Sequence, residues 1–127
     1  MKILIVDDDE IAHILIKNYL DENFFEFYDA YDGSEAVDMA FKNKYDLILM
    51  DQRMPTMDGL TAAKSIKSMS PDIPVISISA FDEDFDKDKL FDFFIRKPYS
   101  KELLRTVILK KLNKWWLYSS RDRIGVS

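Results

Sequence analysis

Cysteine is absent from this 127-residue chain, and histidine occurs once, as His13. Without cysteine the chain has no disulfide, no thiolate nucleophile and no cysteine-ligated zinc or iron–sulfur site. A single histidine cannot form a histidine-rich metal site and argues against a Ser-His-Asp triad. The three glycines lie apart, at Gly33, Gly59 and Gly125, so none belongs to a glycine-rich phosphate loop. These absences argue against thiol, zinc and nucleotide-binding enzymes.

Positive charge is also in short supply, with 18 Lys and Arg against 23 Asp and Glu, a net charge of -5. Such a chain is not drawn to nucleic-acid phosphates or anionic lipid, whereas acidic proteins often bind cations. The apolar run from Met1 to Val6 stops at carboxylates and is too short for a signal peptide or a membrane span. We therefore predict a single soluble, cytoplasmic domain with no membrane insertion and no direct nucleic-acid contact.

Apolar runs and helical patterns alternate along the chain. Short, mostly β-branched runs predict five strands, at Lys2 to Val6, Phe25 to Ala30, Asp46 to Met50, Ile73 to Ile78 and Phe93 to Arg96. Apolar spacing near 3.6 residues predicts helices at Glu10 to Glu22, Ser34 to Asn43, Asp58 to Met69 and from Ser100, a plausible N-cap, through Leu112. Because crossovers between parallel strands are right-handed, this order predicts an α/β fold, a five-stranded parallel sheet flanked by helices on both faces.

Polar residues follow four of the predicted strands, namely Asp7 and Asp8, Asp51, Ser79 and Lys97. In such sheets ligands bind at the carboxyl ends of the strands, where these side chains should meet. Crowded carboxylates repel one another unless a hard cation such as Mg²⁺ neutralises them. A lysine and a hydroxyl facing that cation complete the parts for phosphoryl transfer to a carboxylate. Each residue alone could be an ordinary turn, strand-end or surface residue, but the joint placement predicts an aspartyl phosphate site.

The segment from Asp51 to Gly59 reads Asp-Gln-Arg-Met-Pro-Thr-Met-Asp-Gly. Together with Asp7-Asp8, Ser79-Ala80 and Lys97-Pro98, it resembles the receiver domain of two-component response regulators, over about Lys2 to Leu112. The resemblance implies a flavodoxin-like (βα)5 receiver fold for residues 1–112. It also implies a signalling protein of a histidine-to-aspartate phosphorelay, which is not an enzyme beyond its own phosphoryl transfer and dephosphorylation.

The resemblance assigns roles to individual residues. Asp51 would be the phosphoacceptor, taking its phosphoryl group from a sensor histidine kinase or a histidine phosphotransfer protein. Asp8 and Asp51 would ligate Mg²⁺ with the main-chain carbonyl of Arg53 and a water held by Asp7. Lys97 would pair with the phosphoryl oxygens.

Further roles concern the response to phosphorylation. Ser79, favoured over Ser77 by the Ala80 that follows it, would bond to the phosphoryl group, and Phe94 would turn inward as the hydroxyl moves. This change would bias a two-state equilibrium that controls contact with a downstream protein target, and a homodimer is one form that the contact could take. Arg53 and Phe81 flank the phosphoryl position, and their bulk suggests slow self-dephosphorylation.

The segment between Ser79 and Lys97 is shorter than is usual in the family. We expect a stunted helix there, which leaves the usual output face in question. Asp84, Asp86 and Asp88 have a calcium-like spacing, but the glycine and glutamate that a calcium loop requires are missing. A solvated acidic loop is the favoured interpretation.

The first predicted helix should bury a stripe formed by Ala12, Leu15, Ile16, Tyr19 and Leu20. Ile11 and Ile14 are apolar residues outside this stripe. They could dock the histidine-bearing helix of a partner or simply pack at the edge. His13 is interpreted as a surface residue of the helix.

Residues 113–127 continue the apolar spacing of the last helix with Trp115 and Trp116, and we expect a tail that extends this helix without an effector domain. A haloacid dehalogenase-like phosphatase is one alternative, since Asp7 and Asp9 have its spacing. Ile11 stands where that family has Thr or Val, and the Asp51 to Gly59 segment stays unexplained. The other alternative is a receiver fold that binds partners without phosphorylation.

Overall fold

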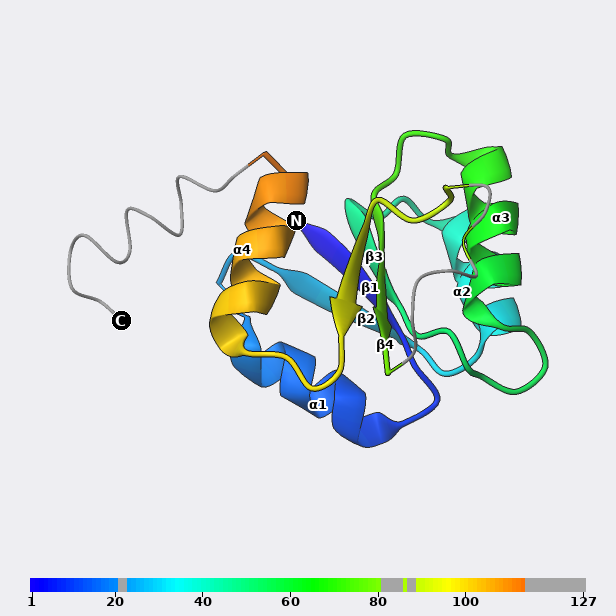
Figure 1. Ribbon diagram of the computed structural model, residues 1–127. Helices are drawn as coiled ribbons and strands as arrows, with labels where there is room; N and C mark the ends of the chain where they lie inside the picture. The colour runs from blue at the N-terminus through cyan, green and yellow to red at the C-terminus, as the bar shows by residue number, and fades with distance from the viewer. Residues whose placement is uncertain (21–22, 81–85, 87–88, 114–127) are drawn as a thin grey trace.

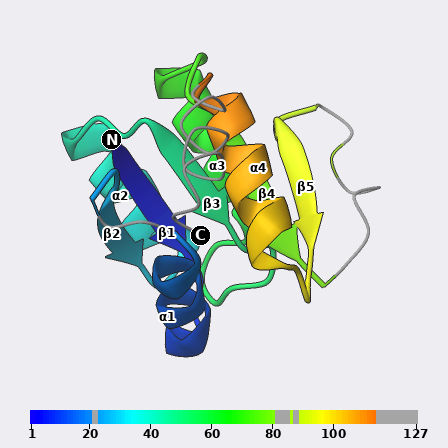
Figure 2. The same ribbon diagram turned by 90° about the vertical axis from the view of Figure 1, so that its left-hand side faces the viewer.

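The computed structural model describes residues 1–20, 23–80, 86 and 89–113. Five parallel strands form one sheet in the order β2-β1-β3-β4-β5, with β2 and β5 at its edges (Figure 2). The strands are β1 (Lys2–Val6), β2 (Glu26–Ala30), β3 (Leu47–Met50), β4 (Val75–Ser79) and β5 (Phe93–Arg96). This confirms the predicted five-stranded parallel α/β fold. The strand order reverses beside β1, so the crevice that binds ligands in such folds lies at the ends of β1 and β3.

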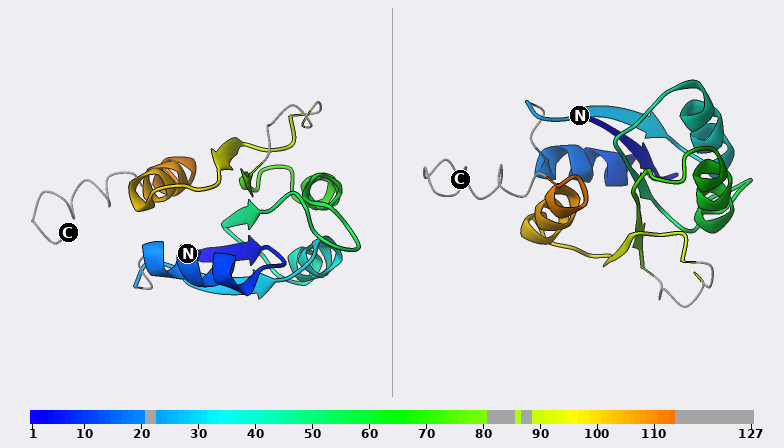
Figure 3. Two further views of the ribbon diagram at one scale, coloured as in Figure 1. Left: turned by 60° about the horizontal axis from the view of Figure 1, so that its bottom comes forward. Right: turned by 90° about the horizontal axis from the view of Figure 1, so that it is seen from above.

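Within the described residues, four helices cover the sheet, with α1 and α4 on one face and α2 and α3 on the other (Figures 1 and 3). They are α1 (Glu10–Tyr19), α2 (Gly33–Lys42), α3 (Gly59–Met69) and α4 (Lys101–Lys111). Each helix begins after a side chain that accepts a hydrogen bond from an amide of its first turn, and these N-caps are Asp9, Asp32, Asp58 and Ser100. Such caps satisfy amides that the helix itself leaves without partners. No helix in the described ranges is long and apolar enough to span a membrane.

Strands β1 and β3, which lie inside the sheet, are almost wholly buried and send alternate side chains to the two faces. Ile3, Ile5 and Leu49 pack beneath α1 and α4. Leu4 and Met50 pack beneath α2 and α3. Because both faces are covered, the strands read as continuous apolar runs, and each buried side chain contributes about 1.5–3 kcal/mol of transfer free energy.

The connection from β4 to β5 was expected to hold a stunted helix and a solvated acidic loop. Most of that segment lies outside the described residues, so the helix stays a prediction. Asp86, which is described, contradicts the solvated loop because it is buried. Its carboxylate accepts hydrogen bonds from the amides of Leu90 at 2.7 Å and Phe91 at 3.0 Å. The acidic side chain therefore satisfies the backbone that leads into β5.

Candidate functional site

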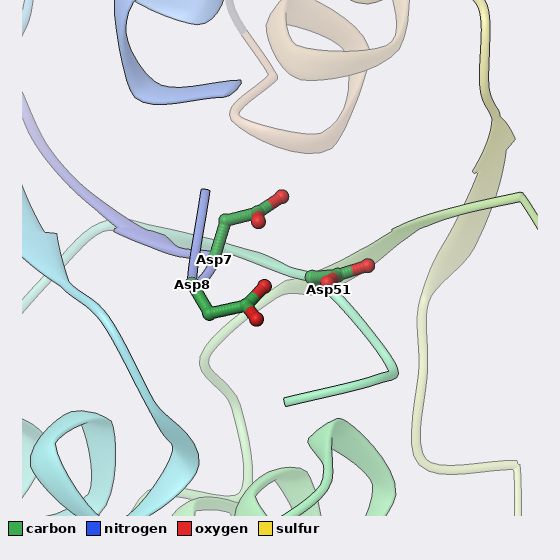
Figure 4. A group of neighbouring side chains, drawn as sticks. All are labelled: Asp7, Asp8 and Asp51. Carbon is green, nitrogen blue, oxygen red and sulfur yellow. The ribbon is translucent and has the colours of Figure 1, made fainter. Parts of the chain in front are cut away.

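Three carboxylates converge where β1 and β3 end (Figure 4). Oxygen atoms of Asp7, Asp8 and Asp51 all lie within 4.8 Å of one another. The two strands pair in register at Val6 and Met50, so the residues that follow them start from neighbouring backbone positions. Asp7 is buried and Asp8 is exposed, which leaves the cluster open to solvent on one side. Topology, not sequence proximity, assembles the cluster.

Lys97, which follows β5, reaches across the sheet edge into this cluster. Its Nζ lies 3.0 Å from Oδ2 of Asp7 and 3.7 Å from Oδ1 of Asp51. Burial alone would lower the pKa of Lys97, but the hydrogen bond that Lys97 donates to Asp7 and the charge of Asp51 raise this pKa above its usual value. Lys97 therefore keeps its positive charge at neutral pH. One lysine facing three carboxylates still leaves an excess of negative charge.

The excess of negative charge affects the pKa of Asp51. Burial, followed by the neighbouring charge of Asp7, raises the pKa of Asp51 from 3.8 to about 6, although Lys97 opposes the rise. A divalent cation would remove this repulsion, and carboxylate oxygens beside an open, solvated flank are ligands that suit Mg²⁺. The donor set present thus fits the metal that the sequence predicts.

The two serines of β4 have different surroundings. Ser77 is buried opposite Met50 in the sheet, and its Oγ accepts a hydrogen bond from Nε2 of Gln52 at 3.4 Å. Ser79 is the last residue of β4, at the same sheet edge as the acidic cluster, and its main-chain oxygen accepts from the amide of Lys97. Ser79 therefore lies nearer than Ser77 to the strand end at which the acidic cluster lies, and its predicted contact with a phosphoryl group stays a prediction.

Phe94, the predicted aromatic switch residue, lies on β5 beside Ser77 of β4. It is partly buried against the core beneath α2 and α3, with its ring centroid 5.7 Å from that of Phe91. The side chain thus joins the sheet to the β4–β5 connection. Its proposed movement stays a prediction.

The connection from β3 to α3 fixes the backbone around Asp51. The amide of Gly59 donates to the main-chain oxygen of Gln52 at 3.0 Å, so the loop closes tightly on itself. Thr56 has a φ of 66°, the left-handed conformation that tight turns often require. Arg53 is exposed in this loop, whereas Phe81, the other residue expected to flank the phosphoryl group, lies outside the described residues.

The prediction that His13 is a surface residue of the helix is wrong, because its side chain is completely buried. Its Nδ1 lies 2.6 Å from Oδ1 of Asp29, and its Nε2 lies 2.8 Å from the main-chain oxygen of Asp7. The buried stripe contains His13 and Ile16 of α1 and Leu20, which caps the C-terminal end of this helix. Leu15, predicted to be buried, is exposed. The spacing of three and four residues among the buried side chains was the signal available in the sequence.

Ile11 and Ile14 on α1 are exposed, at 71% and 50% of their full surface. Beside them, a hollow of about 520 Å³ lies between α1 and the segment that follows β5, and Leu15, Tyr19 and Tyr99 line its apolar wall. Lys97 lies at the rim of the same hollow. An apolar face therefore adjoins the acidic cluster.

Comparison with known proteins gives a consistent answer. Residues 3–112 match the response regulator receiver domain family. The chain is 37% identical over 115 residues to the autoinducer 1 sensor kinase/phosphatase LuxN of Vibrio campbellii, covering 88% of this chain and 14% of LuxN. It is 35% identical over 113 residues to the transcriptional regulatory protein SrrA of Staphylococcus aureus, covering 86% of this chain and 45% of SrrA. The chain thus spans less than half the length of either relative.

Similarity extends to a solved structure, the response regulator TrrA of Thermotoga maritima in complex with Mg²⁺-BeF. It superimposes with a TM-score of 0.80 at 29% identity, and the match covers 87% of this chain and 97% of that protein.

Proposed function

The chain belongs to the response regulator receiver family of two-component signalling, and from that premise we propose that Asp51 accepts a phosphoryl group in a Mg²⁺-dependent reaction. The observation that carries the proposal is that Asp51 clusters with the carboxylates of Asp7 and Asp8 and has the ammonium group of Lys97 3.7 Å away. The donor would be the phosphohistidine of a sensor histidine kinase or of a histidine phosphotransfer protein.

In this reaction an oxygen of Asp51 attacks phosphorus in line with the phosphorus–nitrogen bond of the donor. The new oxygen–phosphorus bond forms, the phosphorus–nitrogen bond breaks, and the leaving imidazole takes a proton. Asp8, Asp51 and the main-chain carbonyl of Arg53 would hold Mg²⁺, with Asp7 acting through a water. When bound, Mg²⁺ neutralises the acidic cluster and the incoming phosphoryl oxygens. Lys97 then pairs with a phosphoryl oxygen as well as with Asp7.

Phosphorylation would control protein contacts by shifting an equilibrium between two conformations. The Ser79 hydroxyl donates to a phosphoryl oxygen, and Phe94 turns inward behind it. Support comes from the place of Ser79 at the sheet edge and from the partly buried Phe94, which also contacts Phe91. The response would be read by a downstream protein or by a second copy of the chain.

The phosphoryl donor must approach Asp51 from the open edge of the sheet. The apolar face that contains Ile11, Ile14 and the hollow lined by Tyr99 borders that edge. We infer that the histidine-bearing helix of the donor packs on this face. LuxN, a sensor kinase/phosphatase, and SrrA, a transcriptional regulatory protein, support a place between a kinase and a target.

The decisive experiment measures the intact mass of the chain after incubation with acetyl phosphate, with and without Mg²⁺. We expect one phosphoryl adduct with Mg²⁺ and none without it. Asp51→Asn should abolish the adduct, because the amide is a poor nucleophile. Asp38→Asn is the matched control, since Asp38 is an exposed carboxylate of α2 paired with Lys42, and it should leave the adduct unchanged.

If Mg²⁺ binds but no adduct forms, phosphoryl transfer from acetyl phosphate to Asp51 is excluded. That result would favour a receiver fold that binds its partners without phosphorylation. An adduct that survives in Asp51→Asn would instead place the phosphoacceptor at another residue.

Arg53 and Phe81 are proposed to lengthen the life of the aspartyl phosphate by screening it from water. Replacing Arg53 with alanine should shorten the half-life severalfold, because a long side chain in the loop after Asp51 is removed. The measurement is the decay of the phosphorylated mass after the donor is removed, and Lys64→Ala, an exposed cation of α3, is the control. A half-life that becomes longer in Arg53→Ala contradicts the proposal.

A further inference from the structure

The buried His13 joins three elements of the fold. From α1, its Nδ1 contacts Oδ1 of Asp29 on β2, and its Nε2 contacts the main-chain oxygen of Asp7 at the end of β1. The ring also stacks on Tyr31, with centroids 4.4 Å apart and planes inclined by 28°. A buried polar ring is stable only when its nitrogens have partners, and both nitrogens of His13 have one.

The chemistry of these partners fixes the direction of the bond to Asp7. A carbonyl oxygen can only accept, so Nε2 of His13 donates to it. Asp29 orients the ring from the opposite side and is itself held by Lys17, whose Nζ lies 2.7 Å from its Oδ2. Burial raises the pKa of Asp29, but the hydrogen bonds from Lys17 and His13 outweigh this and lower it, so Asp29 is a charged acceptor.

The carbonyl that His13 holds belongs to the peptide that links Asp7 to Asp8. Because a peptide is planar, fixing its oxygen also fixes the direction in which the chain enters Asp8. The side chain of Asp7 is held separately, by the amide of Asp9 at 2.9 Å and by Lys97 at 3.0 Å. His13 therefore restrains the Asp7–Asp8 peptide itself, which neither of these two bonds contacts.

We infer that His13 is a positioning residue for the acidic cluster, holding the Asp7–Asp8 peptide so that both carboxylates can serve one divalent cation. This inference rests on the Mg²⁺ site of the proposed function. Three mutually repelling carboxylates tend to separate in the absence of metal, and the bond from His13 opposes that separation at the main chain. Residues that orient metal ligands in this way commonly contribute 10–100-fold to metal affinity.

Two amide substitutions separate the two nitrogens of the ring. The side-chain amide nitrogen of glutamine reaches about as far as Nε2 of histidine, whereas that of asparagine reaches about as far as Nδ1. His13→Gln thus keeps a donor for the oxygen of Asp7, and His13→Asn does not. With Mg²⁺ alone as the titrant in calorimetry, His13→Asn should bind about tenfold more weakly than the wild-type chain, and His13→Gln within about threefold.

The free energy of unfolding and hydrogen exchange at single amides show whether His13 positions the acidic cluster or only fills the core. Both variants lose the ring and its stacking on Tyr31, so both should lower the free energy of unfolding to a similar extent in urea without Mg²⁺. In the folded, metal-free chain, hydrogen exchange at the amide of Asp9 should accelerate in His13→Asn and stay near the wild-type rate in His13→Gln. Exchange is a readout that does not depend on the metal.

The inference is overturned if His13→Asn binds Mg²⁺ as tightly as the wild-type chain, or if both variants lose affinity equally. Either result would reduce His13 to a core residue. A wild-type chain that binds no Mg²⁺ overturns the proposed function instead. The exchange comparison at Asp9 then still decides whether His13 holds the Asp7–Asp8 peptide.

Discussion

Asp51→Asn should make the metal-free protein more stable at pH 7, by about 2 kcal/mol in the free energy of unfolding. A rise in the pKa of Asp51 from 3.8 to about 6 corresponds to an upper value of about 3 kcal/mol at 1.36 kcal/mol per pKa unit, and access of water reduces it. The physical source is the burial of a carboxylate beside Asp7. Asparagine has a similar shape and no charge, so it removes the repulsion.

The sign of the effect determines its pH dependence. Because the pKa of Asp51 is higher in the folded chain, the folded state binds the proton more tightly, and stability falls as pH rises from about 4 to about 6. The difference between Asp51→Asn and the wild-type chain should therefore be absent below about pH 4 and complete above about pH 6. Urea unfolding at intervals from pH 4 to 8 with a chelator present measures it.

Two comparisons make this prediction specific. Asp38→Asn should show no such pH-dependent gain, because that carboxylate is exposed on α2. Adding Mg²⁺ should reduce the difference in the free energy of unfolding between the variant and the wild-type chain. The metal stabilises the charged cluster of the wild-type chain, whereas the variant has lost one carboxylate ligand. If the difference in the free energy of unfolding stays constant from pH 4 to 8, the pKa of Asp51 is not raised in the folded chain and the prediction is wrong.

Gly59→Ala adds one methyl group near the site, and we expect this addition to destabilise the fold strongly. A Cβ at Gly59 would lie 2.2 Å from the main-chain oxygen of Asp51 and 3.0 Å from Cγ of Met50. The first of these neighbours is backbone and has no rotamer to change, so β3 or the start of α3 must move. We expect a loss of about 3 kcal/mol in the free energy of unfolding, together with weaker Mg²⁺ binding because Asp51 moves with its carbonyl.

The control is Thr61→Ala, an exposed position of the same helix that leaves the start of α3 undisturbed. Chemical denaturation and Mg²⁺ titration of both variants are sufficient. If Gly59→Ala matches Thr61→Ala in both measurements, the close approach of α3 to Asp51 is not a constraint on the protein.

The fold was predictable because the chemistry of each strand is simple. Both faces of the sheet are covered, so strands β1 and β3 appear as continuous apolar runs, and the alternation with helices leaves few topologies. Boundaries were less accurate, and the largest error is at the first helix, which was predicted to reach Glu22 and ends at Tyr19. The run predicted from Ile73 begins at Val75 in the structure, after Pro74, which has no N–H to give to the sheet, although its oxygen accepts from Ile48.

The candidate site was predictable for the same topological reason, since parallel strands bring their carboxyl ends to one edge. The cluster of Asp7, Asp8 and Asp51 with Lys97 is brought together as expected. Their chemical roles stay predictions. His13 was missed because a lone polar residue in an amphipathic helix looks solvated, and its burial becomes favourable through partners on other elements, Asp29 and the main-chain oxygen of Asp7.

The bond from Lys97 to Asp7 links residues 90 positions apart in the chain, which has a consequence for the order of folding. During synthesis the three aspartates are complete once β3 has been made, whereas their lysine arrives only with the segment after β5. A nascent chain at that stage therefore holds the three aspartates without the lysine that pairs with them, and contacts between residues this far apart in sequence form slowly. The bond between Lys97 and Asp7 consequently reports that the segment after β5 has reached the ends of β1 and β3.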